Sequence, residues 1–144
     1  MTRTHLRAGI ALIAIVAAGA FTSVAMAAII NGTESSDKLV GTSGADTINA
    51  LGGADKVSGG GGNDIIDGGA ATDLLKGEGG IDTITGGAGF DSIDGGSGGD
   101  VIVASSDGSG DFVECGAGTD LAFVDPGDFV DSDCESVIVI PPPP

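Results

Sequence analysis

The chain has 144 residues, of which 28 are Gly and 21 are Asp or Glu, against only 5 Lys or Arg. A formal net charge of −16 predicts a surface that repels nucleic acid and anionic lipid and attracts cations. Aromatic residues amount to 3% and His5 is the one histidine, which excludes most enzyme classes and limits the chain to one small domain.

Residues 1–27 have the pattern of a secretory signal peptide. Arg3 and Arg7 supply a positive start, residues 8–21 are apolar, and Ala25-Met26-Ala27 forms an A-x-A cleavage site. The alternative is a retained membrane anchor, because the apolar run from residue 8 to residue 30 is just long enough to span a bilayer. We expect cleavage after Ala27 and a secreted or cell-surface protein that has no membrane contact afterwards.

Residues 28–103 contain an internal repeat of nine residues. An aliphatic residue stands two positions after each repeated Asp, and Gly predominates five and two positions before it. Asp recurs at eight successive positions nine residues apart, whereas chance would place an Asp at only about one of those eight positions. The unit is therefore G-G-x-G-x-D-x-U-x, with U aliphatic, and its aspartates are Asp37, Asp46, Asp55, Asp64, Asp73, Asp82, Asp91 and Asp100.

This unit resembles the RTX (repeats-in-toxin) nonapeptide of hemolysin-type calcium-binding proteins, over about residues 32–103. Units 59–67, 86–94 and 95–103 match every defined position, whereas Glu78 replaces the second Gly of its unit and Ala71 the third. The resemblance implies an all-β fold, a right-handed parallel β-roll that binds Ca²⁺ in its turns.

Elementary stereochemistry leads to a similar fold. Six Gly-rich residues allow a tight turn with positive φ, and the three residues x-U-x suit a very short strand with one buried face. Nine residues then form half a coil, so residues eighteen apart stack about 4.8 Å from each other. Two columns of carboxylates follow, one with Asp46, Asp64, Asp82 and Asp100 and the other with Asp37, Asp55, Asp73 and Asp91.

Such columns of like charge predict a bound cation between successive turns. Ca²⁺ accepts six to eight oxygens in flexible geometry, whereas Mg²⁺ requires a small octahedral cage and softer metals require His or several Cys. We expect at most about six Ca²⁺ ions and a chain that folds as they bind, because the aliphatic core is thin. The predicted ligands are the carboxylates of Asp46, Asp55, Asp64, Asp73, Asp82, Asp91 and Asp100, with turn carbonyls at Gly59, Gly61, Gly77, Gly86 and Gly95.

The regular repeat ends at Ala104, and residues 104–136 are predicted to form degenerate repeats and a C-terminal cap. Cys115 and Cys134 stand nineteen residues apart, one turn plus one residue, which predicts a disulfide that staples the cap; two free thiols are the alternative. An EF-hand at 107–118 is rejected, because its sixth and twelfth positions do not fit. Residues 137–144 predict one further strand, ended by four prolines, which could also begin a polyproline spacer.

These features favour an exported calcium-binding structural or adhesive module with an unidentified cell-surface or polysaccharide partner. Enzymatic activity is not expected, because no His follows the predicted cleavage site and the repeats begin directly after it. One alternative is a binder of ice or mineral, but its Thr column is interrupted, since Thr47 and Thr83 share their slot with Lys56, Ile65 and Leu74. Another is a disordered cation buffer, which would not need a periodic aliphatic core.

Overall fold

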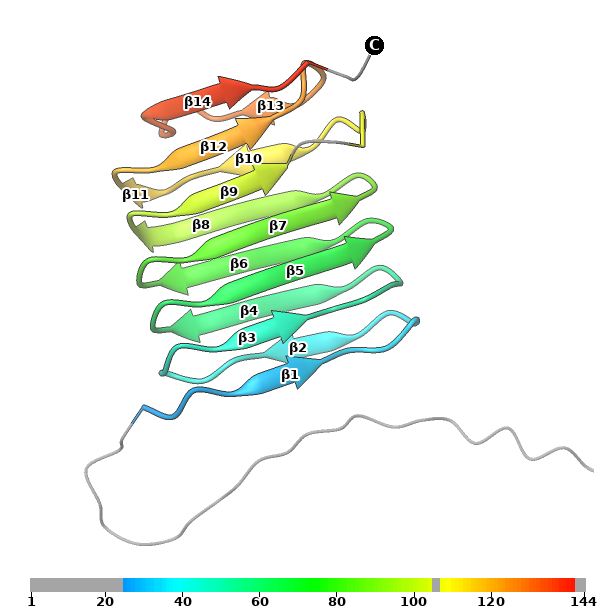
Figure 1. Cartoon of the computed structure of the whole chain (residues 1–144), viewed down its shortest axis with the longest axis vertical. Helices are drawn as coiled ribbons and strands as arrows, with labels where there is room; N and C mark the ends of the chain where they lie inside the picture. Colours follow the sequence, from blue (N-terminus) through cyan, green and yellow to red (C-terminus); the bar gives the residue numbers. More distant parts are fainter. Residues whose placement is uncertain (1–24, 105–106, 142–144) are drawn as a thin grey trace, which may run out of the picture.

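The computed structural model describes residues 25–104 and 107–141 (Figure 1). These residues form two parallel β-sheets, and the chain coils between them as a β-solenoid of about 6 turns. No helix occurs in the described ranges. The predicted all-β parallel roll is thereby confirmed.

Strands alternate between the two sheets along the chain, so each strand pairs with the strand one full turn away. The first sheet contains, in spatial order, β1 (Ile29–Asn31), β3 (Thr47–Asn49), β5 (Ile65–Ala70), β7 (Thr83–Ala88), β9 (Val101–Ala104), β12 (Leu121–Val124) and β14 (Ser136–Val139). The second contains β2 (Lys38–Val40), β4 (Lys56–Gly61), β6 (Leu74–Gly79), β8 (Ser92–Gly98), β10 (Phe112–Glu114) and β13 (Phe129–Val130), with β11 (Ala117–Gly118) beside β8.

The register of the sheets confirms a turn of eighteen residues. Ile48 pairs with Ile66, and Ile66 pairs with Ile84. Past the repeats the turn length varies. Ile93 pairs with Val113, twenty residues on, whereas Val113 pairs with Val130, seventeen residues on, and Ala122 with Val137, fifteen residues on. The strands stay paired through these changes.

Each half-turn contributes one aliphatic residue to the core at the U position of the motif, and the residue two positions later also points inward. That second position is Gly in the central units and Ala50, Ala104, Cys115 or Val124 elsewhere. Buried positions therefore alternate with outward ones along the strands. The buried residues are Ile48, Ala50, Val57, Ile66, Leu75, Ile84, Ile93, Ile102, Ala104, Val113, Cys115, Ala122 and Val124, each at most 2% exposed.

The central strands are longer than the three residues that the sequence predicted. β4 to β7 have six residues and β8 has seven, because the strands continue into the Gly-rich part of the unit and pair there, for example Gly60 with Glu78. The turn conformation persists where the motif departs from Gly: Leu51, Ala71 and Glu78 have φ values of 74°, 88° and 75°. Contacts from neighbouring turns therefore hold these residues in the left-handed region.

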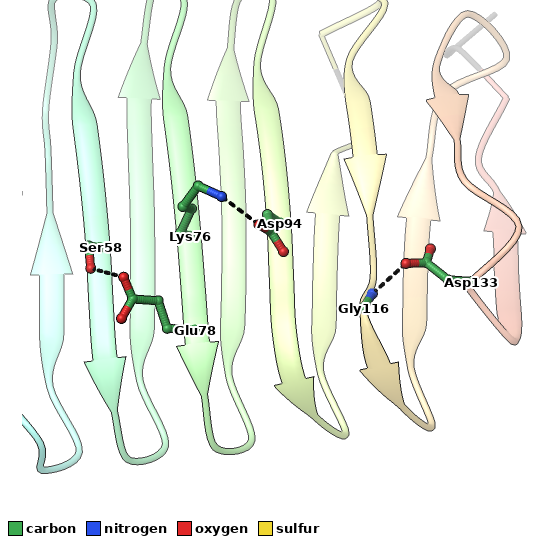
Figure 2. Close-up of polar contacts among 6 residues, drawn as sticks. All are labelled: Ser58, Lys76, Glu78, Asp94, Gly116 and Asp133. Atoms are coloured by element: carbon green, nitrogen blue, oxygen red, sulfur yellow. Dashed lines mark hydrogen bonds and ion pairs between the residues drawn. The ribbon is translucent and has the colours of Figure 1, made fainter.

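The C-terminal turn is linked by the predicted disulfide, which is confirmed between Cys115 and Cys134 with a Cα–Cα distance of 5.1 Å. Beside it, the Asp133 carboxylate accepts the backbone N–H of Gly116 at 2.8 Å (Figure 2). It also accepts the backbone N–H of Cys115 at 3.2 Å. The final strand, β14, begins at Ser136, one residue earlier than predicted.

The predicted signal peptide, or alternatively the anchor, falls almost entirely in residues 1–24, which lie outside the described residues. Within the part of the chain that the structure describes, no helix has the length and apolar character needed to cross a bilayer.

Candidate metal centre

An aspartate precedes each strand from β2 to β9. Asp37, before β2, is half-buried, and from Asp46 onward the aspartate is buried at the turn. The seven predicted ligands, Asp46, Asp55, Asp64, Asp73, Asp82, Asp91 and Asp100, are at most 3% exposed. Strands of the two sheets run in opposite directions across the roll, so the aspartates form two columns on opposite edges (Figure 1). This is the arrangement that the nine-residue period predicted.

A ladder of hydrogen bonds connects the aspartates within each column. The Oδ1 atom of Asp64 accepts the backbone N–H of Asp46 at 2.7 Å, and Oδ1 of Asp82 accepts that of Asp64 at 2.8 Å. The second column repeats the pattern, with Asp55 N–H donating to Asp73 at 2.8 Å. One carboxylate oxygen of each repeat is therefore used to hold the preceding turn in place.

The second oxygen of these carboxylates is buried and has no hydrogen-bond donor within the described residues. Each such Oδ2 atom lacks the partner that a buried carboxylate oxygen normally has. Eight aspartates share this state: Asp55, Asp64, Asp73, Asp82, Asp91, Asp100, Asp111 and Asp120.

The first Gly of the unit leaves room for this oxygen. A Cβ atom built on Gly59 would lie 2.4 Å from Asp64 Oδ2 and 2.9 Å from the carbonyl oxygen of Gly77 on the next turn. On Gly77 it would lie 2.4 Å from both Asp82 Oδ2 and the carbonyl oxygen of Gly95. A carboxylate oxygen and a carbonyl oxygen from successive turns therefore border the same small space, as ligands of a hard cation must.

Four of the five predicted glycines lie at this position, namely Gly59, Gly77, Gly86 and Gly95. Gly61 does not: a Cβ there would meet Ser43 Cα at 3.7 Å and no carboxylate. Asp46 is also different, because its Oδ2 already accepts the N–H of Thr42. The structure therefore does not bring Gly61 and Asp46 into the set that surrounds the unpartnered oxygens.

Two members of the set were missed at the sequence level. Asp111 and Asp120 are at most 1% exposed, and their Oδ1 atoms accept the N–H groups of Asp91 at 2.9 Å and Asp100 at 2.7 Å. The insertion after Ala104 breaks the nine-residue period, which concealed them. The signal that could have found them is the return of that period, since Asp111 and Asp120 are nine residues apart.

Burial raises the pKa above the ordinary Asp value for seven of these carboxyl groups, those of Asp55, Asp64, Asp73, Asp82, Asp91, Asp100 and Asp111. Loss of hydration is the largest cause, and the charges of neighbouring aspartates act in the same direction, while the backbone hydrogen bond opposes both. The pKa rises to about 6 for Asp73 and Asp82 and to about 7 for Asp111. Without a cation, protons therefore compete for these oxygens close to neutral pH.

Lysines do not compensate the buried columns. Lys76 forms an ion pair with Asp94 at 2.6 Å on the outer face of the second sheet, where Ser58 also donates to Glu78 at 2.6 Å (Figure 2). Lys38 and Lys56 are exposed. Cys115, Asp133 and Cys134 also cluster, but both sulfurs belong to the disulfide and cannot act as thiolate ligands.

Comparison with protein families gives one match, to the RTX calcium-binding nonapeptide repeat. It covers four overlapping copies at residues 31–66, 40–75, 67–102 and 76–109, together more than half of the chain. Comparisons with curated proteins and with solved structures give no match.

Proposed function

Because the chain belongs to the RTX calcium-binding nonapeptide repeat family, we propose that it is an exported structural or adhesive module that folds as several Ca²⁺ ions bind between its stacked turns. The observation that carries the proposal is the row of buried aspartate oxygens without a hydrogen-bond donor in the described residues. A divalent cation would satisfy these oxygens and compensate their charge.

The residues that would hold calcium are the buried aspartates, through Oδ2, and the first residues of the units, through their carbonyl oxygens. Both kinds of oxygen meet beside Gly59, Gly77 and Gly95. Oxygen-only donors and a flexible Gly-rich turn suit Ca²⁺ better than Mg²⁺, which keeps its water and requires stricter geometry. When bound, the ion supplies the positive charge that the three exposed or outward lysines do not bring to the columns.

Folding and calcium binding are coupled in this proposal for two physical reasons. Each half-turn of the regular repeats buries a single large aliphatic residue, and Gly loses more conformational freedom on folding than any other residue. In addition, burying ionised carboxylates is unfavourable until a cation joins them. The cation therefore contributes free energy that the apolar core alone does not provide.

The proposal includes an extracellular site of action, where calcium at about millimolar levels would fill sites of ordinary extracellular affinity. The signal-like pattern of residues 1–27 and the disulfide both fit an oxidising space outside the cell. Export is tested by recovering the chain from the medium and sequencing its N-terminus, which we expect at Ala28. Finding the full-length chain retained in the membrane would favour the anchor instead.

The ordered-surface alternative is disfavoured by the sheet register. On the outer face of the first sheet, Thr47 is followed by Ile65, then by Thr83 and Val101. Hydroxyl groups therefore alternate with aliphatic side chains, and the regular Thr array that such a binder would use is not formed.

The test of the proposed function is a calcium titration followed by far-UV circular dichroism and calorimetry. We expect sheet signal to appear with Ca²⁺, not with Mg²⁺, and to disappear in EDTA. Asp82→Asn should weaken calcium binding, whereas the matched variant Asp94→Asn, on the outer face, should not. Equal sheet content in EDTA and in calcium would refute coupled folding, and equal binding by the two variants would refute the assigned ligands.

A further inference from the structure

A disulfide links the last turn at the C-terminal end of the roll, but the apolar side chains of the final strand remain exposed. Val137 continues the buried column of Ile102 and Ala122, yet it is 43% exposed, and Val139 is 56% exposed. Ile138, on the outer face of the same strand, is 47% exposed. Terminal repeats of solenoid proteins usually carry a polar outer face, so an apolar last strand requires an explanation.

β14 also offers free backbone hydrogen-bonding groups, because it is the edge strand of its sheet. The backbone N–H of Ser136 donates to the backbone carbonyl of Asp120 at 3.1 Å, and that of Ile140 donates to the backbone carbonyl of Val124 at 2.8 Å. The backbone groups of Ser136 and Ile140 therefore face β12. The intervening Val137 and Val139 therefore direct their N–H and C=O groups to the open edge. Charged residues, Pro and bulges are the usual protection of such an edge. Glu135 precedes β14 and Pro141 follows Ile140, but the four residues of β14 itself include none of them.

The opposite end of the same sheet has a matching edge at β1. Thr47 N–H donates to Ala28 C=O and Gly32 N–H donates to Asn49 C=O, each at 2.8 Å, so Ile29 and Asn31 direct their groups outward. Ile29 is 80% exposed, and Ile30, which begins the core column, is only partly buried. Each end of the roll therefore has an edge strand with outward backbone groups and exposed aliphatic side chains.

We propose that β14 of one copy pairs in parallel with β1 of a second copy, so that rolls stack head to tail. With Val137 opposite Ile30, the free groups of Val137 meet those of Ile29 and Asn31, in the phase that a parallel ladder requires. The same register continues the aliphatic column from one copy into the next. Because this contact is heterologous and leaves each end free for another copy, it produces filaments rather than a closed dimer.

Charge favours this arrangement over the pairing of two C-terminal ends. Asp131, Asp133 and Glu135 lie in the last turn, and no Lys or Arg follows Lys76 in the sequence. Two of the lysines, Lys38 and Lys56, are exposed on β2 and β4 near the other end. Like ends would oppose acidic groups, whereas head-to-tail stacking brings lysines near them.

The experiment is sedimentation velocity on the chain as recovered from the medium, in saturating calcium. The proposal requires a folded roll, so sheet content is recorded by circular dichroism in the same samples; unfolded chain would count against the proposed calcium function instead. We expect an apparent mass that rises with concentration past twice that of the monomer. Val137→Lys/Val139→Lys should weaken self-association at least about tenfold. The matched control, Ile65→Lys/Ile81→Lys, alters similarly exposed residues in the middle of the roll and should assemble normally.

Mixing distinguishes the polarity of the contact. A second variant, Ile29→Lys/Asn31→Pro, blocks pairing at the open edge of β1. If Pro disturbs the strand, Ile29→Lys/Asn31→Lys replaces it. We expect either blocked chain alone to remain monomeric and a mixture of the two to form a dimer and nothing larger. Dimers of the β1-blocked chain alone would show that two β14 edges pair, and monomers of the unaltered chain would show that the edges stay free; each result overturns the proposal.

Discussion

Two alanine substitutions within β4 test whether the carboxylate space described above is a binding feature. A Cβ on Gly59 would lie 2.4 Å from Asp64 Oδ2 and 2.9 Å from the Gly77 carbonyl oxygen. A Cβ on Gly61, two residues further along the same strand, meets no atom closer than Ser43 Cα at 3.7 Å. Neither glycine has a positive φ, so backbone strain does not differ between the two variants.

The expected magnitudes follow from this geometry. Gly→Ala reduces the entropy of the unfolded chain and so stabilises by about 0.4–1 kcal/mol where the side chain fits, as it does at Gly61. At Gly59 the clash costs about 1–3 kcal/mol, because the Asp64 carboxylate or the facing backbone must move. The two variants should therefore differ by about 2 kcal/mol in the free energy of calcium-coupled folding, which is about 30-fold in the overall equilibrium constant. Shared over about six ions, this shifts the calcium midpoint by about twofold.

The assay is a calcium titration of both variants and the unaltered chain, followed by far-UV circular dichroism, because the chain has no Trp or Tyr for fluorescence. Gly59→Ala should shift the midpoint to higher calcium, and Gly61→Ala should leave it unchanged or lower it slightly. Thermal unfolding in saturating calcium provides an independent measure. Free energies of unfolding that agree within about 0.5 kcal/mol in saturating calcium, together with indistinguishable calcium midpoints, would show that the space beside Gly59 is not used for binding.

In EDTA, acidification from pH 8 to pH 5 should increase sheet content. Burial raises the pKa of Asp73 and Asp82 to about 6, so the stability that their protonation provides is lost as pH rises through that value. In a calcium titration the same acidification should raise the calcium concentration at the midpoint, and a roll that acid stabilises both in EDTA and in calcium would contradict the reasoning. Ala71→Gly should stabilise the calcium-loaded roll by about 0.5–1 kcal/mol, because Ala71 has a φ of 88°, and a lower melting temperature would argue against strain at this residue. Reducing the bond between Cys115 and Cys134 should lower stability by about 3 kcal/mol in thermal unfolding with and without reductant, so equal melting temperatures would show that the bond does not hold the last turn.

The parallel solenoid, its eighteen-residue turn and the two aspartate columns could be predicted from the sequence. Each nine-residue unit repeats the same local chemistry, with Gly for the turn, Asp at its end and one aliphatic residue for the buried face. Residues such as Ile48, Ile66 and Ile84 must then stack, because identical half-turns follow one another. The disulfide was predicted from a spacing of one eighteen-residue turn plus one residue, but the turn there is seventeen residues, since Val113 pairs with Val130, and the bond spans that turn plus two.

Other properties depend on how one turn lies on the next, which no single repeat contains. Oδ1 of Asp82 is occupied by the amide of Asp64 while Oδ2 is left without a donor, although both oxygens belong to the same side chain. Gly59 borders that oxygen and Gly61 does not, although both are glycines of one unit. Local sequence determines the period of the coil, but the contacts between successive turns decide which atoms are buried together, which edges stay open, and therefore where a cation or a second copy can bind.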